Sequence, residues 1–171
     1  MIRVASRWLF ALLLAFLVSA FAADPQSSWV FDSAKPNPDP SNSTALPSDE
    51  EQVYGAILDQ VRYWNAHDIE HYMELLWKSP DLLVIIDGEQ IMGWAELLAT
   101  YQRGYPDRSE MATVTLQRVK IQKLSSDFYL ALTWFTFRTH GKNAFSTDTM
   151  IFRKFPEGWK VVNGHSSFLE P

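Results

Sequence analysis

The sequence contains no cysteine among its 171 residues. Disulfide bonds are therefore excluded, and so is the lipid-modified cysteine that anchors a bacterial lipoprotein. Any domain that the chain forms must be stabilised by noncovalent packing. Aromatic residues make up 14% of the chain, and their side chains bury a large apolar area each, which suits that requirement.

Clusters of basic residues are also missing. The chain has 15 Lys and Arg residues against 20 Asp and Glu residues, a formal net charge of −5, with no row of cations that would neutralise phosphates. We therefore expect no nucleic acid partner. The G-x-S-x-G motif of hydrolases is absent, so no nucleophile motif is present, and the glycine-rich phosphate loop is absent too. We expect no cofactor.

Only one long apolar run occurs, and it lies near the N-terminus. Trp8–Val18 is shorter than the roughly 20 residues that cross a bilayer as a helix. Arg3 and Arg7 precede the run, and the small residues of Ala20–Ala22 follow it. The pattern predicts a cleaved signal peptide over residues 1–22, with an uncleaved anchor as the alternative. The mature protein is then expected in the periplasm or outside the cell, without a stable membrane anchor.

Residues 23–47 have the composition of a linker. Prolines recur among serine, asparagine, aspartate and lysine residues, so the segment has too little apolar surface to offset the entropy lost on ordering. Trp29, Val30 and Phe31 are the exception, and they are candidates for docking on the folded domain.

The folded domain is expected over residues 48–171, and it begins with helical signals. Ser48 and Glu51 form a capping box. Apolar residues at helical spacing extend this helix to about Asn65. Asp68 has the position of an N-cap for a second, shorter helix.

Hairpin and strand signals follow these two helices. Asp87-Gly88 indicates a short hairpin, and a third helix is predicted over residues 94–104. Apolar alternation changes parity near Gln117-Arg118, which indicates a β-bulge. A long strand over residues 128–140 and a turn at Pro156–Gly158 complete an α+β domain with helices across one face of a sheet.

Several motifs between residues 48 and 167 are similar to those of one protein family. They are Trp64-Asn65-Ala66-His67-Asp68, Gly93-Trp94, Tyr105-Pro106-Asp107-Arg108 with Met111, and Gly158-Trp159-Lys160-Val161-Val162 leading to His165-Ser166-Ser167. With this order of elements, the chain resembles the NTF2-like superfamily, and within it the SnoaL-like and DUF4440 branch. The resemblance implies a cone-shaped α+β domain in which three N-terminal helices pack on a curved antiparallel β-sheet, and it implies a homodimer.

Two positions depart from the family pattern. His67 stands where many relatives have glycine, and Asn163-Gly164-His165 replaces a more usual His-Asp-His, which removes a carboxylate from the last strand. The fold hosts ketosteroid isomerase-like, dehydratase-like and epoxide hydrolase-like enzymes. It also hosts noncatalytic ligand binders and dimerisation modules, so the resemblance does not select a reaction.

Asp148 and His165 are the candidate catalytic pair. They lie on strands joined by the turn at Pro156–Gly158, at similar distances from it. In one register the two side chains are directly opposite, and the carboxylate would orient the imidazole as a general base. A register shifted by one residue puts Thr149 opposite His165 and turns Asp148 to the other face. A structural hydrogen bond at the end of the sheet is the noncatalytic alternative.

Four aromatic residues are candidates for lining a ligand pocket: Tyr101, Trp134, Tyr105 and Trp64. Tyr101 and Trp134 are favoured, because a buried hydroxyl or indole N–H needs a polar partner such as a ligand. Core packing is the alternative, and for Trp64 it is the preferred interpretation.

No metal site is expected. His67-Asp68-Ile69-Glu70-His71 matches the H-x-x-E-H pattern of zinc peptidases, which needs both histidines on one helix face. Because Asp68 caps a helix that begins after His67, this geometry is lost.

Three functions remain open. The first is an exported domain that binds a small, largely apolar molecule in its pocket. The second is an isomerase-like or dehydratase-like enzyme that uses His165 and Asp148 as a base and Tyr101 as a hydrogen-bond donor. The third is a noncatalytic dimerisation module.

Overall fold

The computed structural model of the chain describes residues 30–32 and 47–169. The expected signal peptide lies outside these residues, as does most of the expected linker. Val30–Asp32 form a short strand, β1, at one edge of the sheet. Val30 and Phe31 therefore dock on the domain through backbone pairing with β4, as expected, whereas Trp29 lies outside the described part.

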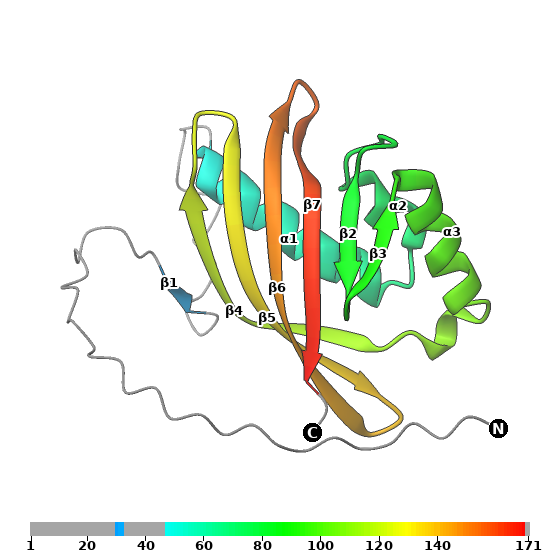
Figure 1. Ribbon diagram of the computed structural model, residues 1–171. Helices are drawn as coiled ribbons and strands as arrows, with labels where there is room; N and C mark the ends of the chain where they lie inside the picture. Colours follow the sequence, from blue (N-terminus) through cyan, green and yellow to red (C-terminus); the bar gives the residue numbers. More distant parts are fainter. Residues whose placement is uncertain (1–29, 33–46, 170–171) are drawn as a thin grey trace, which may run out of the picture.

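One seven-stranded sheet forms the body of the domain, in the order β1-β4-β5-β6-β7-β2-β3. After β1, the strands are β2 (Leu83–Ile86), β3 (Glu89–Met92), β4 (Thr113–Lys123), β5 (Phe128–Thr139), β6 (Lys142–Phe155) and β7 (Gly158–Leu169). The four long strands β4 to β7 pair antiparallel with their chain neighbours. The sheet bends strongly along these strands, as Figure 1 shows.

The expectation of a wholly antiparallel sheet is corrected at one position. Strand β2 runs parallel to β7 and pairs Leu83 with Asn163 and Ile86 with Ser166. These strands come from opposite ends of the domain, so no tight turn forces them to run in opposite directions. The last strand therefore lies between its hairpin partner β6 and the short β2–β3 hairpin.

Three α-helices cover one face and one end of this sheet. They are α1 (Asp49–Asn65), α2 (Ile69–Glu74) and α3 (Trp94–Gly104), and a short 3₁₀-helix, η2 (Arg108–Glu110), precedes β4. In Figure 1, α1 crosses behind the long strands, and α2 and α3 lie beside β2 and β3. The face behind the strands is called the inner face below, and the opposite one the outer face.

Local capping explains where the first two helices begin. The Ser48 hydroxyl accepts a hydrogen bond from the Glu51 amide at 3.2 Å, and the Glu51 carboxylate accepts one from the Ser48 amide at 2.7 Å. The Asp68 carboxylate accepts from the His71 amide at 3.1 Å. Both caps predicted from the sequence are confirmed, and they satisfy amide groups that have no partner inside a helix.

Side-chain hydrogen bonds to backbone atoms fix the helices against the sheet. Trp64 donates from Nε1 to the Ala112 carbonyl at 2.9 Å. The Asn65 side chain accepts a hydrogen bond from the Val114 amide at 2.7 Å and donates one to the Val114 carbonyl at 2.8 Å. Trp94 donates to the Met73 carbonyl at 2.8 Å, which ties α3 to α2. These bonds satisfy the indole N–H groups of Trp64 and Trp94.

A β-bulge in β4 confirms the one expected near Gln117-Arg118. Its pairing with β5 shifts between Leu116 and Arg118. The sequence located this bulge because the apolar residues change from one set of alternate positions to the other there. An extra residue in a strand turns the residues that follow it to the opposite face.

A second β-bulge, in β7, was not expected. Phe152 pairs with Val161, but the next residue of β6, Ile151, pairs with Asn163, so Val162 is the extra residue. Beyond Val162 the alternation of β7 is therefore reversed relative to its first half. This reversal decides which side chains of the last strand face the helices.

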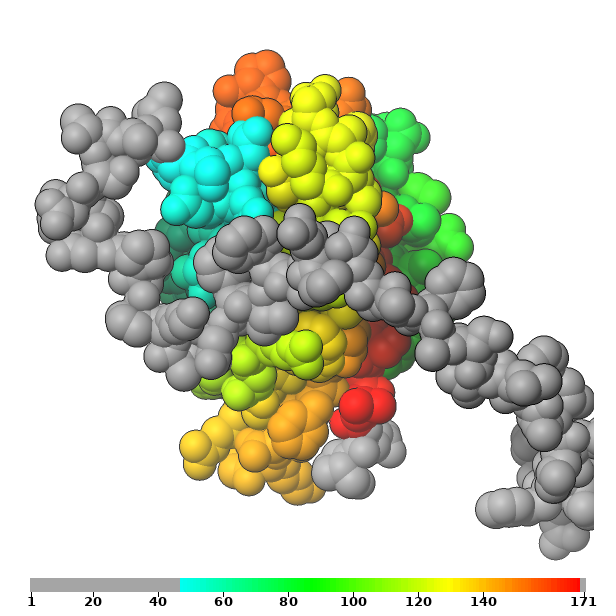
Figure 2. Space-filling model, turned by 90° about the vertical axis from the view of Figure 1, so that its left-hand side faces the viewer, coloured from blue at the N-terminus to red at the C-terminus, as the bar shows by residue number. Residues whose placement is uncertain are grey.

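The turns of the sheet lie at its two ends. Figures 1 and 2 show the β4–β5 and β6–β7 turns at the end near the start of α1, and the β5–β6 turn projecting from the other end. Lys154 and Asp49 form an ion pair at 2.6 Å across the first of these ends. Among the described residues, no helix combines the length and the apolar character needed to cross a membrane.

Candidate functional site

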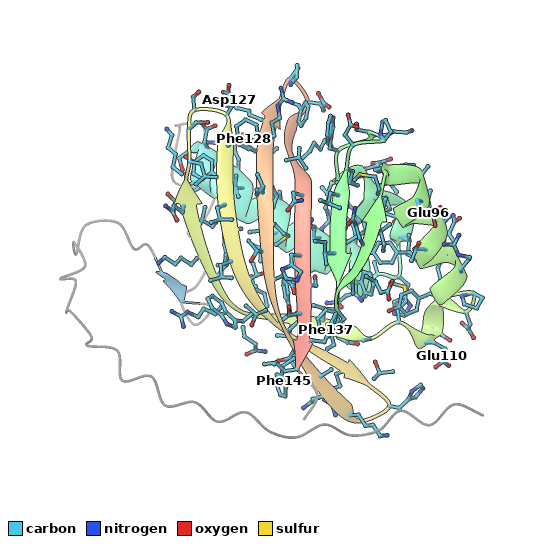
Figure 3. All side chains as sticks on the ribbon, in the orientation of Figure 1. Glu96, Glu110, Asp127, Phe128, Phe137 and Phe145 are labelled. Atoms are coloured by element: carbon cyan, nitrogen blue, oxygen red, sulfur yellow. The ribbon has the colours of Figure 1, made fainter. Side chains whose placement is uncertain are left out.

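A cavity of about 340 Å³ lies between the inner face of the sheet and the helices. Helices α1, α2 and α3 and strands β2 and β4 to β7 contribute to its walls. The aromatic residues of the lining are Trp64, Tyr72, Tyr101, Tyr105, Phe135, Phe137 and Phe168. Strand β5 contributes Phe137 but not Phe128, so the cavity lies toward the Phe137 end of the sheet in Figure 3.

Asp148 is the charged group inside this largely apolar lining. It lies in the middle of β6, faces inward between Ser146 and Met150, and only 8% of it is exposed. On the neighbouring strands it pairs with Thr133 and Ser166. Asp148 and Ser166 border the cavity, and Thr133, fully buried beside Asp148, extends this polar row across the sheet, since directly opposite residues have Cβ atoms within about 5.5 Å.

Burial raises the pKa of the Asp148 carboxyl from 3.8 to about 6. The nearby hydroxyls of Ser146 and Ser166 and the charge of His165 act in the opposite direction, and the charge of Asp87 acts with burial. The cost of removing the carboxylate from water raises the pKa more than the hydroxyls lower it. The carboxyl group therefore changes its charge close to neutral pH.

Several polar atoms around Asp148 have no hydrogen-bond partner among the described residues. They are Oδ1 of Asp148, Oγ1 of Thr133 and Oγ of Ser146. Leaving such a buried atom unpaired costs about 1–3 kcal/mol, so native proteins rarely tolerate it without a function. Of these three residues Asp148 alone borders the cavity, so its Oδ1 is the unpaired atom that a polar ligand group there would reach.

Tyr72 and Tyr101 face Asp148 from the helical side of the cavity. Burial raises the pKa of Tyr72 to about 12 and that of Tyr101 well above its ordinary value, and the Tyr101 hydroxyl is hydrogen-bonded to that of Tyr72. The charge of Asp148 adds to both shifts. The two phenols thus stay protonated at neutral pH; the bond between them uses the Tyr101 proton, and the Tyr72 proton is available to a hydrogen-bond acceptor.

The tyrosines pack edge-to-face around Trp64. The ring centroids of Tyr72, Tyr101 and Tyr105 lie 5.5, 5.6 and 5.6 Å from that of Trp64. Such T-shaped pairs stabilise a cluster beyond the area that they bury. Trp64, Tyr101 and Tyr105 therefore border the cavity, and Trp64 is also part of the core, which was its preferred interpretation; that they bind a ligand stays a prediction.

Of the two registers considered for Asp148 and His165, the one with the two residues directly opposite does not occur. Thr149 is the residue opposite His165, because the extra residue Val162 shifts the register by one. Asp148 nevertheless stays on the inner face, and His165 is the residue that turns. His165 borders the cavity, but its side chain is exposed and its Nε2 lies 3.5 Å from the Ser167 hydroxyl. The imidazole is therefore not placed as a base inside the cavity.

Trp134 is corrected as a cavity residue. Its neighbours Thr133 and Phe135 are buried on the inner face, so Trp134 points to the outer face, where the Arg118 guanidinium lies 4.6 Å from a ring centroid. Strand β5 is apolar on both faces, so its sequence alone does not reveal which face borders a cavity.

Tyr72, which lines the cavity, and Thr133, which is buried beside Asp148, are residues that the sequence did not single out. Tyr72 has helical spacing with apolar neighbours and looked like a packing residue. Thr133 offered a usable signal, since it is a polar residue in the run Leu130-Ala131-Leu132-Thr133-Trp134 of a strand covered on both sides. A buried hydroxyl in such a run needs a partner.

The H-x-x-E-H residues are occupied by other interactions. His67 precedes α2 with a φ of 58°, and His71 Nδ1 lies 2.6 Å from the Asp68 carboxylate. Glu70 pairs with Arg108 through two contacts of 2.6 Å, which lower the pKa of Glu70 to about 2. Within residues 30–32 and 47–169, no group of three His, Asp or Glu residues is arranged to hold a metal ion.

Solved structures with the same architecture come from several bacteria. An NTF-2 like protein of unknown function from Shewanella oneidensis is 24% identical, with a TM-score of 0.65 over 68% of this chain and 97% of that one. A protein of unknown function from the DUF3225 family, from Pectobacterium atrosepticum, is 21% identical, with a TM-score of 0.59 over 73% and 94%.

A third similar structure has a suggested activity. It is a "putative dehydratase" of the NTF2-like family from Streptomyces avermitilis, 20% identical, with a TM-score of 0.62 over 72% of this chain and 97% of that one. At these identities the likeness establishes the NTF2-like fold and not the activity.

No curated protein matches the sequence. A family model described as AtzH-like matches residues 51–171. The SnoaL-like and DUF4440 branch stays a prediction.

Proposed function

Because the chain belongs to the AtzH-like family and has the NTF2-like fold, we propose that its cavity binds a small, largely apolar molecule whose one polar end contacts Asp148. The observation that carries this proposal is the buried Asp148 carboxyl, which borders the cavity with Oδ1 unpaired among the described residues. A ligand atom at this point would satisfy Oδ1.

The size and lining of the cavity define the ligand further. A volume of about 340 Å³ is at the lower end of the range of about 300–1,000 Å³ for small-molecule sites. Aromatic rings form much of the wall, and the polar atoms gather where the hydroxyls of Tyr72 and Tyr101, on the helical side, face Asp148 on the sheet. A molecule with one or two rings, or a short chain, and a polar group at one end fits this division.

Saturable binding of neutral aromatic alcohols tests the proposal. Gly164 lines the cavity, and a Cβ added there would make only ordinary contacts of 3.8 and 3.9 Å with Val84. We expect benzyl alcohol and 1-naphthalenemethanol to bind the wild type in calorimetric titrations, and Gly164→Leu to weaken binding at least tenfold by filling the cavity.

Gly55→Leu is the matched control, since Gly55 lies on α1 with nothing within 4 Å of an added Cβ. It should bind both alcohols as the wild type does. The absence of saturable binding to the wild type, or equal binding by Gly164→Leu, would contradict the proposal.

An isomerase-like or lyase-like enzyme is the second candidate, and the Asp148 pKa of about 6 favours it. A general base works best when its pKa is near the operating pH. Asp148 would take a proton from carbon, and the hydrogen-bonded pair of Tyr101 and Tyr72 would donate to the oxygen that becomes negative. His165 has no direct role, because its side chain lies outside.

Hydrogen–deuterium exchange at the carbon next to the carbonyl of 2-indanone tests this candidate. We expect the protein to accelerate exchange saturably, Asp148→Asn to abolish the acceleration, and Tyr101→Phe to reduce it. A rate equal to that of free carboxylate buffer would exclude the candidate.

We also infer that the mature protein is exported and forms a homodimer through the outer face of its sheet. The signal-like N-terminus supports the first inference. The second rests on apolar side chains that point outward from adjacent strands and are only partly buried: Leu130, Leu132, Trp134, Ile151 and Val162. Figure 1 shows no described helix over this face.

A further inference from the structure

We propose that the cavity selects organic cations: an ammonium or amidinium group contacts the Asp148 carboxylate, and the aromatic rings enclose the rest of the molecule. This inference rests on the proposed function and names its ligand class. It follows from the charge inside the cavity, from the aromatic lining and from the unpaired carboxylate oxygen.

The carboxylate of Asp148 has no cationic partner in the cavity. No Lys or Arg is among the described residues that line it. The single imidazole at its border, that of His165, is on a side chain that points outward and is exposed. The Asp87 carboxylate adds negative charge from the β2–β3 turn. At neutral pH the cavity therefore contains an ionised carboxylate with no Lys or Arg in the lining to balance it, and a ligand cation would supply that positive charge.

The wall opposite this carboxylate consists of aromatic rings. Trp64, Tyr72 and Tyr101 form one cluster, in which the Tyr72 and Tyr101 centroids lie 5.8 Å apart. The faces of such rings carry negative charge and attract cations within about 6 Å, most strongly when water is excluded. The carboxylate and the aromatic rings thus both attract a positively charged ligand.

Other charge classes fit this site less well. An anion would meet Asp148 and Asp87 without a basic side chain to balance them. A neutral hydrogen-bond acceptor needs Asp148 in its protonated form, which is the minor form above a pKa of about 6. A neutral donor satisfies Oδ1 but leaves the charge uncompensated.

The pH dependence of binding separates these classes. A cation binds the ionised carboxyl, so its affinity should rise by about tenfold between pH 5 and pH 7. A neutral acceptor should show the opposite trend. The other titratable groups that act on Asp148 are Tyr72 on α2, Tyr101 on α3, His165 on β7 and Asp87 in the β2–β3 turn. The two tyrosines stay protonated over this interval.

Matched series of probes test the proposal. Benzylammonium, benzyl alcohol and benzoate have one ring and a cationic, neutral or anionic end, and the 1-naphthylmethyl compounds extend the comparison to two rings. We expect calorimetric titration at pH 7 to give at least tenfold tighter binding of a cation than of its matched alcohol, and no binding of the anions.

Variants then assign the selectivity to one carboxyl group. Asp148→Asn should weaken cation binding at least tenfold, remove its pH dependence and change alcohol binding less than threefold. Asp127→Asn is the control, because Asp127 is exposed in the β4–β5 turn at the far end of the sheet (Figure 3). His165→Gln should keep the pH dependence, which would assign that dependence to the carboxyl group.

The outcomes distinguish this inference from the proposed function. Alcohols that bind as tightly as the cations, or more tightly, would overturn the cation selectivity and leave a cavity that binds apolar molecules. Binding of neither cations nor alcohols would overturn both. Cation binding that survives in Asp148→Asn would overturn the assignment of the cation to this carboxyl group.

Discussion

Asp148 is the residue that sets the polarity of the cavity. It combines a buried carboxyl group, an unpaired oxygen and a pKa of about 6. A pKa shift from 3.8 to about 6 corresponds to a folding penalty on the order of 3 kcal/mol for the ionised form. A protein keeps such a penalty where the group has a function, which is why we place the ligand contact there.

Replacement of Asp148 by asparagine should stabilise the protein at neutral pH. The folded state raises the pKa of this acid, so the wild type loses stability as the pH rises from about 4 to about 6 and does not regain it above. Asp148→Asn removes the charge and should unfold at higher urea concentration at pH 8, with a gain of about 1–3 kcal/mol.

Urea denaturation of both proteins at pH 4.5 and pH 8 measures this effect. The difference between them should shrink at the lower pH, where Asp148 is mostly protonated. A loss of stability in Asp148→Asn that is equal at both pH values would show that the wild-type carboxyl group makes stabilising bonds instead.

Among the secondary-structure elements, the β-bulge at Val162 has the largest effect on the site. It turns the second half of β7 by one position, so that Gly164, Ser166 and Phe168 border the cavity. Without it, the alternate residues of the strand would face inward, among them His165. One extra residue thus exchanges an imidazole for a serine hydroxyl next to Asp148.

Alanine substitutions at the end of β7 test this reversed alternation. Phe168 faces inward, with its ring centroid 5.0 Å from that of Phe137, whereas Leu169 is 62% exposed. We expect Phe168→Ala to lower the free energy of unfolding by about 1–3 kcal/mol. Leu169→Ala should change it by less than about 0.5 kcal/mol. Thermal and urea unfolding give both values, and the reverse ranking would contradict the register.

Parts of these elements could be predicted from the sequence, for identifiable reasons. Ser48 and Asp68 are N-caps with local signatures, and the bulge in β4 was visible because apolar residues on both sides of it report parity. The bulge in β7 lacked this signal, since Asn163 to Ser167 are polar or glycine and define no apolar face. Trp134 was misplaced because β5 is apolar on both faces.

At the scale of the whole molecule, the two faces of the sheet have separate uses in our proposal. The inner face and the helices enclose the ligand, and the outer face meets a second copy of the chain. Tyr101 and Tyr105 were candidates for the cavity because aromatic residues with polar atoms suit such sites, whereas core packing was preferred for Trp64. Which face of the sheet encloses it depends on registers between distant segments, and local patterns do not encode these.

A charge on the outer face should separate the proposed dimer. Leu132 points outward from the centre of β5, opposite Lys120 and Thr149. We expect the wild type to sediment as a dimer and Leu132→Glu as a monomer at the same concentration. Gln102→Glu on the exposed side of α3 is the control and should remain dimeric. A wild type that sediments as a monomer would exclude the dimer.

A titration of the Asp148 carboxyl group tests the central claim most directly. The side-chain carboxyl carbon can be followed by ¹³C NMR across pH 3 to 9 and assigned by its absence in Asp148→Asn. A carboxyl group enclosed by the cavity wall should titrate with a pKa of about 6. A midpoint close to the ordinary value of 3.8 would show that Asp148 is in contact with bulk water, and it would contradict the site described above.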